Sequence, residues 1–405
     1  MELYYPIILD GATGTQLQKR GYTSDNSPEK WVLEHPEAYM DAQRGYIESG
    51  SNVIYAPTFT ASRVKLEEYG IFGEVEELNR RLVALARETA QGRAYVGGDM
   101  SPTGKFLYPL GDMTFEEMVE VYTEQVRALE SAGVDFYIIE TMTSVPDARA
   151  AVIAVKENSR KPVLVTFTCD GGGKTLSGSD VTAAIVIMQG MGVDAVGLNC
   201  SSGPDDMLVQ LRRMSEYAEL PLIAKPNAGM PQIVGGKTVY DCPPEVFSAH
   251  VSEMAECGVM LFGGCCGTEK EHIAALKTAL EGVKMNPPSP KHTGMLPCAT
   301  EKLPCYLAPD TPTEKVIACS GELEEKLENE LSSGRSILAL SIENEDELAA
   351  FTDNQYMITK PLCIKTGSAE LLEAALRAYQ GRAMYDGPLD ESVLLPLSKK
   401  YGLIF

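Results

Sequence analysis

Three cysteines in this sequence have neighbours that suit a metal site. Two of them, Cys265 and Cys266, are adjacent within the segment 263–267, Gly-Gly-Cys-Cys-Gly, and the third, Cys200, lies far upstream. The glycines free the backbone to turn so sharply that two adjacent sulfurs can face one ion. Three thiolates leave one position open on a tetrahedral Zn²⁺, as in catalytic zinc sites. We therefore predict that Cys200, Cys265 and Cys266 are the zinc ligands and the catalytic residues.

A site with three thiolates favours chemistry at a fourth sulfur. A thiol that enters the open position loses its proton, whereas a free thiol with a pKa of about 8.5 is mostly protonated at neutral pH. The three cysteinates make the centre net negative, so it activates water poorly but leaves a bound sulfur electron-rich. Alkyl transfer to a thiol is therefore favoured over hydrolysis.

A disulfide between the two adjacent cysteines is the alternative for this segment. Such a bond between Cys265 and Cys266 would be strained, and it would leave Cys200 without a role. We therefore favour the metal site.

Short apolar segments alternate with longer segments of helical spacing, and eight such pairs are found before residue 282. Eight βα units in about 280 residues match the size of a closed barrel, whereas a doubly wound sheet usually has fewer strands. We predict an α/β fold, a (β/α)₈ TIM barrel. A T-x-x-E string at 268–271 predicts the start of its last helix. The expected strands are 6–10, 52–57, 94–99, 135–141, 162–168, 195–200, 221–226 and 259–263. The expected helices are 37–49, 75–91, 115–131, 146–157, 179–191, 204–219, 244–256 and 268–280.

Polar and reactive residues follow most of these strands. Because the carboxyl ends of all eight strands meet at one mouth of such a barrel, we expect the side chains there to share one site. The cysteines follow the sixth and eighth strands, so the barrel would bring them together. The other strand-end residues of interest are Asp10, Gly11, Thr58, Glu140 and Asn227.

The chain changes character after the barrel. Residues 286–312 contain seven prolines and no periodic pattern, which predicts a linker without helices or strands. We expect a barrel domain over 1–285 and a small α/β domain over 313–405. The second domain should contain strands at 316–319, 336–340, 362–365 and 382–385, and helices at 323–331, 345–351 and 369–379.

Composition excludes several classes of partner. The chain has 35 Lys and Arg against 57 Asp and Glu, a formal net charge of −22, so nucleic acid and anionic membranes are poor partners. Its apolar segments are shorter than the roughly 20 residues of a membrane span. Ten cysteines and a start without a basic-then-apolar leader indicate reduced thiols in the cytoplasm.

Five motifs resemble the homocysteine S-methyltransferase family, and within it most closely the homocysteine-binding module of cobalamin-dependent methionine synthases. The resemblance covers about residues 6–282. It implies a TIM barrel, zinc on the three cysteines, and methyl transfer to homocysteine that gives methionine. The motifs are 9–15 (LDGATGT), 46–50 (YIESG), 197–201 (GLNCS), 226–229 (PNAG) and 262–268 (FGGCCGT).

The resemblance also implies roles for the other strand-end residues. Asp10 and Glu140 would hold the amino group of homocysteine, which suits an ammonium ion; strand-end carboxylates that cap a neighbouring helix are the alternative. Asn227 would orient the substrate or occupy the open zinc position when substrate is absent. Apart from the resemblance, we expect Gly11 in the substrate site, and we expect Thr58 to shape the pocket for the substrate carboxylate through backbone N–H groups; an ordinary turn is the alternative for Thr58.

The methyl donor is expected to come from outside the chain. Residues 313–405 resemble a shortened pterin-binding barrel, but they are too few for eight βα units. A corrinoid-binding D-x-H-x-x-G string is absent from the sequence. The donor would be a corrinoid protein or a small methyl carrier such as S-methylmethionine.

Two other functions stay open at this stage. The zinc site could act on another thiol or on a corrinoid protein. Alternatively, the chain could be a non-catalytic regulatory module that binds zinc or thiols as a redox-sensitive clasp.

Overall fold

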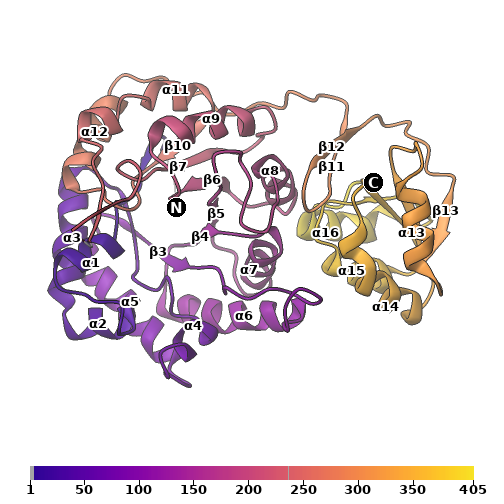
Figure 1. The fold of residues 1–405 in the computed structure, drawn as a ribbon, viewed down its shortest axis with the longest axis horizontal. Helices are drawn as coiled ribbons and strands as arrows, with labels where there is room; N and C mark the ends of the chain where they lie inside the picture. The colour runs from indigo at the N-terminus through magenta and orange to yellow at the C-terminus, as the bar shows by residue number, and fades with distance from the viewer. Residues whose placement is uncertain (1–3, 236) are drawn as a thin grey trace. The chain divides into compact units, whose positions relative to one another are not determined.

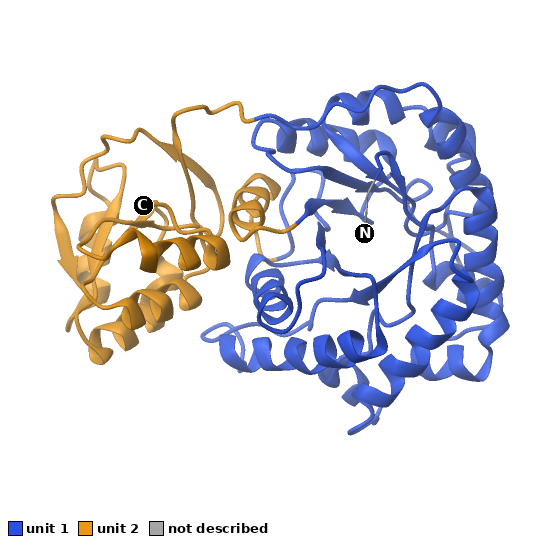
Figure 2. Cartoon of the chain, turned by 180° about the vertical axis from the view of Figure 1, so that it is seen from behind, with its two compact units in different colours: residues 1–176, 194–289 blue, residues 177–193, 290–405 orange. Residues whose placement is uncertain are grey.

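The computed structural model describes residues 4–235 and 237–405. Residues 1–3, at the start of the chain where no leader segment is predicted, lie outside the described residues. The chain divides into two compact units (Figure 2). We call residues 1–176 with 194–289 the barrel unit, and residues 177–193 with 290–405 the C-terminal unit.

Eight parallel strands form the sheet of the barrel unit (Figure 1), in the order β1-β10-β7-β6-β5-β4-β3-β2. The first and last strands of this order, β1 and β2, are linked through Asn52, which directly precedes β2. The backbone N–H of Asn52 donates to the carbonyl oxygen of Ile8 at 2.9 Å, and the Asn52 side chain accepts from the N–H of Ile8. The sheet is therefore nearly closed, and the predicted (β/α)₈ barrel is confirmed. Its strands are β1 (Ile7–Ile8), β2 (Val53–Tyr55), β3 (Tyr95–Met100), β4 (Phe136–Met142), β5 (Val163–Phe167), β6 (Ala195–Asn199), β7 (Leu222–Lys225) and β10 (Val259–Phe262).

The interior of the barrel explains why these strands read as apolar runs. Alternate residues of the strands point inward and pack into one buried cluster, while their neighbours face the surrounding helices. This leaves the polar strand ends at the rim. The cluster includes Ile7, Leu9, Val53, Tyr55, Phe136, Ile138, Leu164, Ile223 and Leu261.

Helices surround the strands (Figure 1). Side chains cap the first turns of several helices: Thr114 caps α6 in a capping box with Glu117, and Asp180 caps α8. Among the described residues, each helix is too short or too polar to span a bilayer. The helices between the barrel strands are α1 (Gly14–Lys19), α2 (Pro28–Glu34), α3 (Pro36–Ser49), α4 (Arg63–Glu67), α5 (Val75–Ala90), α6 (Phe115–Ala132), α7 (Val145–Asn158), α8 (Val181–Gly190), α9 (Pro204–Ser215), α10 (Pro244–Phe247), α11 (Val251–Glu256) and α12 (Lys270–Leu280).

Four details of the barrel unit differ from the sequence expectation. The short helices α1, α2 and α4 were not predicted, nor was the hairpin of β8 (Gln232–Val234) and β9 (Lys237–Val239). The single helix expected over 244–256 is divided into α10 and α11. The capping residue of α12 is Glu269, which pairs with His272, so the T-x-x-E prediction was wrong. The threonine of that string, Thr268, instead makes hydrogen bonds that stabilise the cysteine loop of the candidate metal centre.

The C-terminal unit contains a four-stranded parallel sheet in the order β13-β14-β15-β16. The prediction that 286–312 lacks strands was wrong, because β11 and β12 form an antiparallel hairpin there. The helix α16 was also not predicted. The elements are β11 (Leu296–Ala299), β12 (Pro304–Leu307), β13 (Val316–Ala318), α13 (Leu323–Leu331), β14 (Leu338–Ser341), α14 (Glu345–Asn354), the 3₁₀-helix η1 (Gln355–Met357), β15 (Leu362–Lys365), α15 (Ala369–Ala378), β16 (Met384–Tyr385) and α16 (Glu391–Tyr401).

The hairpin covers one face of this small sheet. Ala339, Cys363 and Met384 are register partners on neighbouring strands, so they share a face. They pack in one cluster with Cys298 of β11 and Leu307 of β12. One face of this sheet is thus covered by the unit's own hairpin.

Candidate metal centre and substrate cavity

The three cysteines predicted to bind metal lie together at the mouth of the barrel. Cys200 follows β6, and Cys265 and Cys266 follow β10. The sulfurs of Cys200 and Cys266 are 3.9 Å apart, and all three sulfurs lie within 4.8 Å of one another. Tetrahedral zinc with Zn–S bonds of about 2.3 Å needs sulfurs about 3.8 Å apart. All three cysteines are free, so the disulfide alternative is not what the structure has.

Strand β7 holds both cysteine segments in place because it lies between β6 and β10. The backbone N–H of Cys200 donates to the carbonyl oxygen of Lys225 at 3.1 Å, and that of Cys265 donates to Pro226 at 2.8 Å. The backbone of Cys200 is in the left-handed region, with φ of 60°. A cysteine in that conformation is strained, and such strain is often found at functional sites.

Thr268 stabilises the loop that carries the paired cysteines. Its hydroxyl donates to the carbonyl oxygen of Cys265 at 2.7 Å and accepts from the N–H of Ala12 at 3.0 Å. A β-carbon on Gly264 would lie 2.5 Å from that hydroxyl. The glycine therefore allows the threonine to approach the loop backbone closely.

The electrostatics of the cluster suit a cation. Hydrogen bonding with Cys265 lowers the pKa of the Cys200 thiol, but the contact with Cys266 and burial raise it more strongly, to about 11. The pKa values of Cys265 and Cys266 are raised as well, so the three thiols stay neutral when they have only one another as neighbours. Three adjacent thiolates require a positive charge between them, which a divalent metal ion supplies.

A cavity of about 340 Å³ opens beside the three sulfurs. Cys200, Cys265 and Cys266 line it, together with the predicted substrate residues Asp10, Gly11 and Glu140. Four carboxylates line it, against one ammonium group. These charged residues are Asp10, Glu29, Asp99, Glu140 and Lys225.

Lys225 links the carboxylates that the sequence analysis singled out. Its ammonium nitrogen lies 3.1 Å from Asp10 Oδ1, 2.9 Å from Glu140 Oε1 and 3.8 Å from the centre of the Tyr55 ring. Burial acts to lower the pKa of Lys225, but the two carboxylates outweigh it and the pKa is raised. Sequence reasoning missed this residue, although a lysine inside the apolar strand 221–226 was a visible signal.

The carboxylate of Asp10 is tied to the barrel on three sides. Besides Lys225, its Oδ2 accepts from the side chain of Gln43 at 3.1 Å and from the N–H of Tyr55 at 2.9 Å. Neither Asp10 nor Glu140 caps a helix, because the caps of the helices that follow them are Thr13 and Ser144. The helix-cap alternative for these two acids is therefore wrong.

Two other predicted substrate residues are not among those that line the cavity. The hydroxyl of Thr58 is occupied by the backbone of Asp99, with contacts of 2.9 and 3.1 Å to its carbonyl oxygen and N–H. Asn227 follows β7, and its backbone N–H donates to Ser202. Its side-chain oxygen is buried and has no hydrogen-bond partner among the described residues.

Gly11 lines the cavity and packs against Tyr46 so closely that there is no room for a side chain. A β-carbon there would lie 2.6 Å from the Tyr46 ring. The Tyr46 hydroxyl lies 2.8 Å from the carbonyl oxygen of Ala12 and 3.1 Å from that of Thr268, so the ring cannot move freely. We expect Gly11→Ala to lower the free energy of unfolding by about 1–3 kcal/mol through overpacking. Urea denaturation checks this, with Gly14→Ala, where an added β-carbon meets nothing within 4 Å, as the matched control. Equal stability of the two variants would contradict the close packing of Gly11 against Tyr46.

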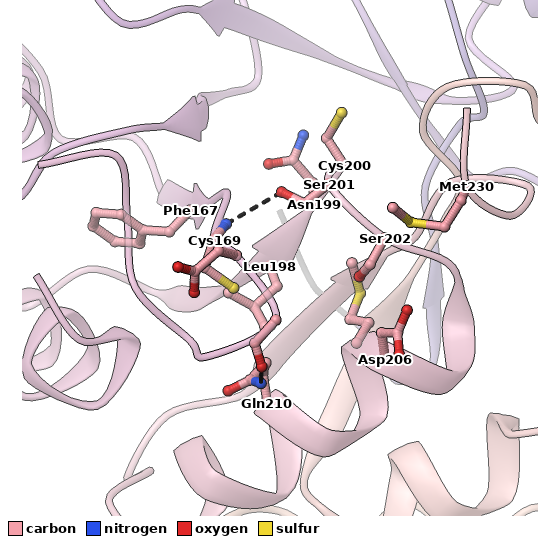
Figure 3. A pocket seen from close by; sticks show the side chains of 13 residues that line it. Phe167, Cys169, Leu198, Asn199, Cys200, Ser201, Ser202, Asp206, Gln210 and Met230 are labelled. Carbon is pink, nitrogen blue, oxygen red and sulfur yellow. Dashed lines mark hydrogen bonds between the residues drawn. The ribbon is translucent and has the colours of Figure 1, made fainter. Parts of the chain in front are cut away.

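A second pocket, of about 240 Å³, shares Cys200 with the cavity (Figure 3). Figure 3 shows the Cys200 side chain pointing away from those of Asp206 and Gln210. The neighbouring Asn199 contacts the cluster of cysteines: its side-chain N–H groups lie 2.7 Å from Thr141 Oγ1 and 3.7 Å from Cys265 Sγ. Asn199 thus links the end of β4 to one of the three sulfurs.

Comparison with known proteins gives relatives for the barrel. A family model described as homocysteine S-methyltransferase matches residues 7–280. The chain is 31% identical to the methionine synthase of Mycobacterium tuberculosis over 296 residues, which are 69% of this chain and 25% of that protein. It is 32% identical to the methionine synthase of Mycobacterium leprae over 292 residues, which are 68% of this chain and 24% of that protein. The chain thus spans about a quarter of the length of these relatives.

Solved structures share the fold of the barrel. The oxidized and metallated forms of the homocysteine methyltransferase MmuM from Escherichia coli align with a TM-score of 0.57 and 22% identity. The alignment covers 67% of this chain and 95% of MmuM.

Proposed function

Because this chain belongs to the homocysteine S-methyltransferase family, we propose that it transfers a methyl group to the thiol of homocysteine and so forms methionine. The observation that carries the proposal is the cluster of three sulfurs on the wall of an acidic cavity. The sulfurs suit activation of a thiol, and the carboxylates suit a substrate with an ammonium group.

Cys200, Cys265 and Cys266 would hold the metal, and Zn²⁺ is the ion that best suits three sulfur ligands with one open position. Zinc bound there would lower the pKa of the incoming substrate thiol and keep its sulfur nucleophilic. The chain's own residues fix the geometry: β7 holds both cysteine segments, and Asn199 contacts the sulfur of Cys265. The unpartnered amide oxygen of Asn227 fits a residue that orients the substrate or takes the open position when substrate is absent.

Glu140 and Asp10 would face the ammonium group of homocysteine. Both are buried in the cavity wall. The single positive charge of Lys225 balances only part of the negative charge of these two residues and the neighbouring acids. Gly11 would leave room for the substrate beside α1, and Thr58 would act indirectly by fixing the backbone of Asp99. The methyl group then passes from the donor to the substrate sulfur, and the donor leaves with the electron pair of the broken bond.

The methyl donor would be a corrinoid protein or a small methyl carrier. The small sheet of the C-terminal unit is covered by its own hairpin, which does not favour folate binding inside a barrel there. In the division we propose, a homocysteine-binding barrel over 1–285 is followed by a small α/β domain over 313–405 that does not supply the methyl group, and the hairpin within 286–312 packs with that small domain. The free cysteines support a reducing, cytoplasmic location.

The proposal is tested by metal analysis and by a panel of methyl donors. We expect the purified chain to contain close to one zinc per chain and to form methionine from homocysteine with methylcobalamin, a methylated corrinoid protein or S-methylmethionine. Removal of the metal by a chelator should abolish turnover, and added zinc should restore it. Faster turnover of another thiol in a side-by-side assay would replace homocysteine as the substrate. A zinc-loaded protein that does not bind homocysteine would favour the non-catalytic module instead.

A further inference from the structure

Asp99 is a buried carboxylate in the cavity wall with an unused acceptor. It lies near the end of β3 and is 7% exposed. The N–H of Met100 donates to its carboxylate. Its Oδ1 nevertheless has no hydrogen-bond partner among the described residues. A buried polar atom without a partner is uncommon and costly, so it calls for an explanation.

The other three carboxylates of the cavity are already engaged. Asp10 accepts from Gln43, from the N–H of Tyr55 and from Lys225. Glu140 Oε1 lies 2.9 Å from the ammonium nitrogen of Lys225, although it too has no hydrogen-bond partner among the described residues. Glu29 accepts from the hydroxyl groups of Ser27 and Thr60, and from the N–H of Thr60 at 3.1 Å. Among the described residues that line the cavity, Asp99 Oδ1 is the carboxylate oxygen with neither a hydrogen bond nor an ion pair, so Asp99 is the acid best able to receive a new donor.

The charge balance of the cavity points to a cationic donor. Lys225 is the one basic side chain among the described residues that line the cavity, and it already faces two acids. Burial, and next the charge of Glu140, raise the pKa of Asp99 well above its usual value. An ammonium ion placed at Oδ1 would favour the ionised carboxylate and supply the missing hydrogen bond.

The position of Asp99 is fixed before any ligand arrives. Its backbone carbonyl oxygen accepts from the Thr58 hydroxyl, and its N–H donates to the same hydroxyl. The side chain therefore projects from a rigid strand rather than from a mobile loop. Binding of a ligand then costs little conformational entropy at this residue.

We propose that Asp99, in addition to the Asp10 and Glu140 named above, receives the ammonium group of the thiol substrate and so selects amino-acid thiols over thiols that lack an amino group. This inference rests on the proposed function, because it takes homocysteine as the ligand of the cavity. It adds a specificity-determining residue that acts on the amino group and takes no part at the sulfur.

The test compares two ligands that differ only in the amino group. Homocysteine and 4-mercaptobutanoate are titrated by calorimetry into the zinc-loaded full chain, as wild type and as Asp99→Asn. We expect the variant to bind homocysteine about 10- to 100-fold more weakly, because a charged hydrogen bond is lost. Its affinity for 4-mercaptobutanoate should stay within about threefold of wild type. Asp135→Asn is the matched control: Asp135 pairs with Arg87 at the start of β4, and the variant should leave both affinities unchanged.

The other outcomes separate the inference from the proposed function. Equal weakening of both thiols in Asp99→Asn would mean a structural role, and no weakening would mean no contact; either result overturns the inference while the proposed function stands. A wild-type protein that binds neither thiol overturns both. Zinc content and thermal unfolding identify a misfolded Asp99→Asn, and Asp99→Ser then provides the same comparison with a smaller side chain.

Discussion

Replacement of Cys265 by alanine is expected to lower kcat/KM for methyl transfer to homocysteine at least about a thousandfold, which is about 4 kcal/mol of transition-state stabilisation. The sulfur of Cys265 lies within 4.8 Å of those of Cys200 and Cys266, and it receives an N–H from Asn199 at 3.7 Å. Two remaining thiolates would hold zinc weakly, and a substrate thiol without zinc stays mostly protonated at neutral pH. Metal content by mass spectrometry and methionine formation measure the two effects separately.

The matched control for this variant is Cys257→Ala. Cys257 is a half-buried cysteine at the C-terminal end of α11, in the same unit but outside the cluster. It should keep both zinc and turnover, which would show that loss of any one cysteine is not enough. If Cys265→Ala retained zinc and full turnover, the three-sulfur site would be wrong. If it lost turnover but retained zinc, the activation of the thiol would have to come from other residues of the cavity.

The sequence could predict the barrel and the cysteine cluster because both leave local signals. Buried parallel strands are apolar on both faces, so each of the eight appears as a short run with bounds within a few residues of those observed. The adjacent cysteines and their glycines form one unbroken string. Given a barrel, Cys200 must then meet them, since β6 and β10 end at the same rim and flank β7.

Residues whose role depends on distant partners could not be predicted in the same way. Lys225 and Asp99 become informative only when Asp10, Glu140 and the cavity wall surround them. Thr268 has the spacing of a helix cap, but its hydroxyl is needed by the cysteine loop, so Glu269 caps the helix instead. The proline-rich segment 286–312 has no alternation, and its hairpin is stabilised by packing against the small sheet.

Replacement of Lys225 by methionine is expected to lower the free energy of unfolding by about 3–5 kcal/mol at neutral pH, because it leaves two buried carboxylates without their cation. The side chains of Lys225 and Asp10 are 3% and 1% exposed, and that of Glu140 is 11% exposed, so water cannot replace the lost contacts. Methionine keeps a similar length and can still pack on the Tyr55 ring. Urea denaturation of the metal-free proteins measures the loss without a contribution from zinc binding.

Two further variants distinguish a lost charge balance from a lost side chain. Lys30→Met removes an ion pair of the same length, 2.9 Å to Glu74, but with both side chains more than 40% exposed, so it should cost less than about 1 kcal/mol. The double variant Lys225→Met/Glu140→Gln should regain at least about 1 kcal/mol relative to Lys225→Met, because it removes one of the unpaired charges. A Lys225→Met protein as stable as wild type would mean that the carboxylates do not need the lysine. In that case an ammonium ligand would be held by hydrogen bonds rather than by charge.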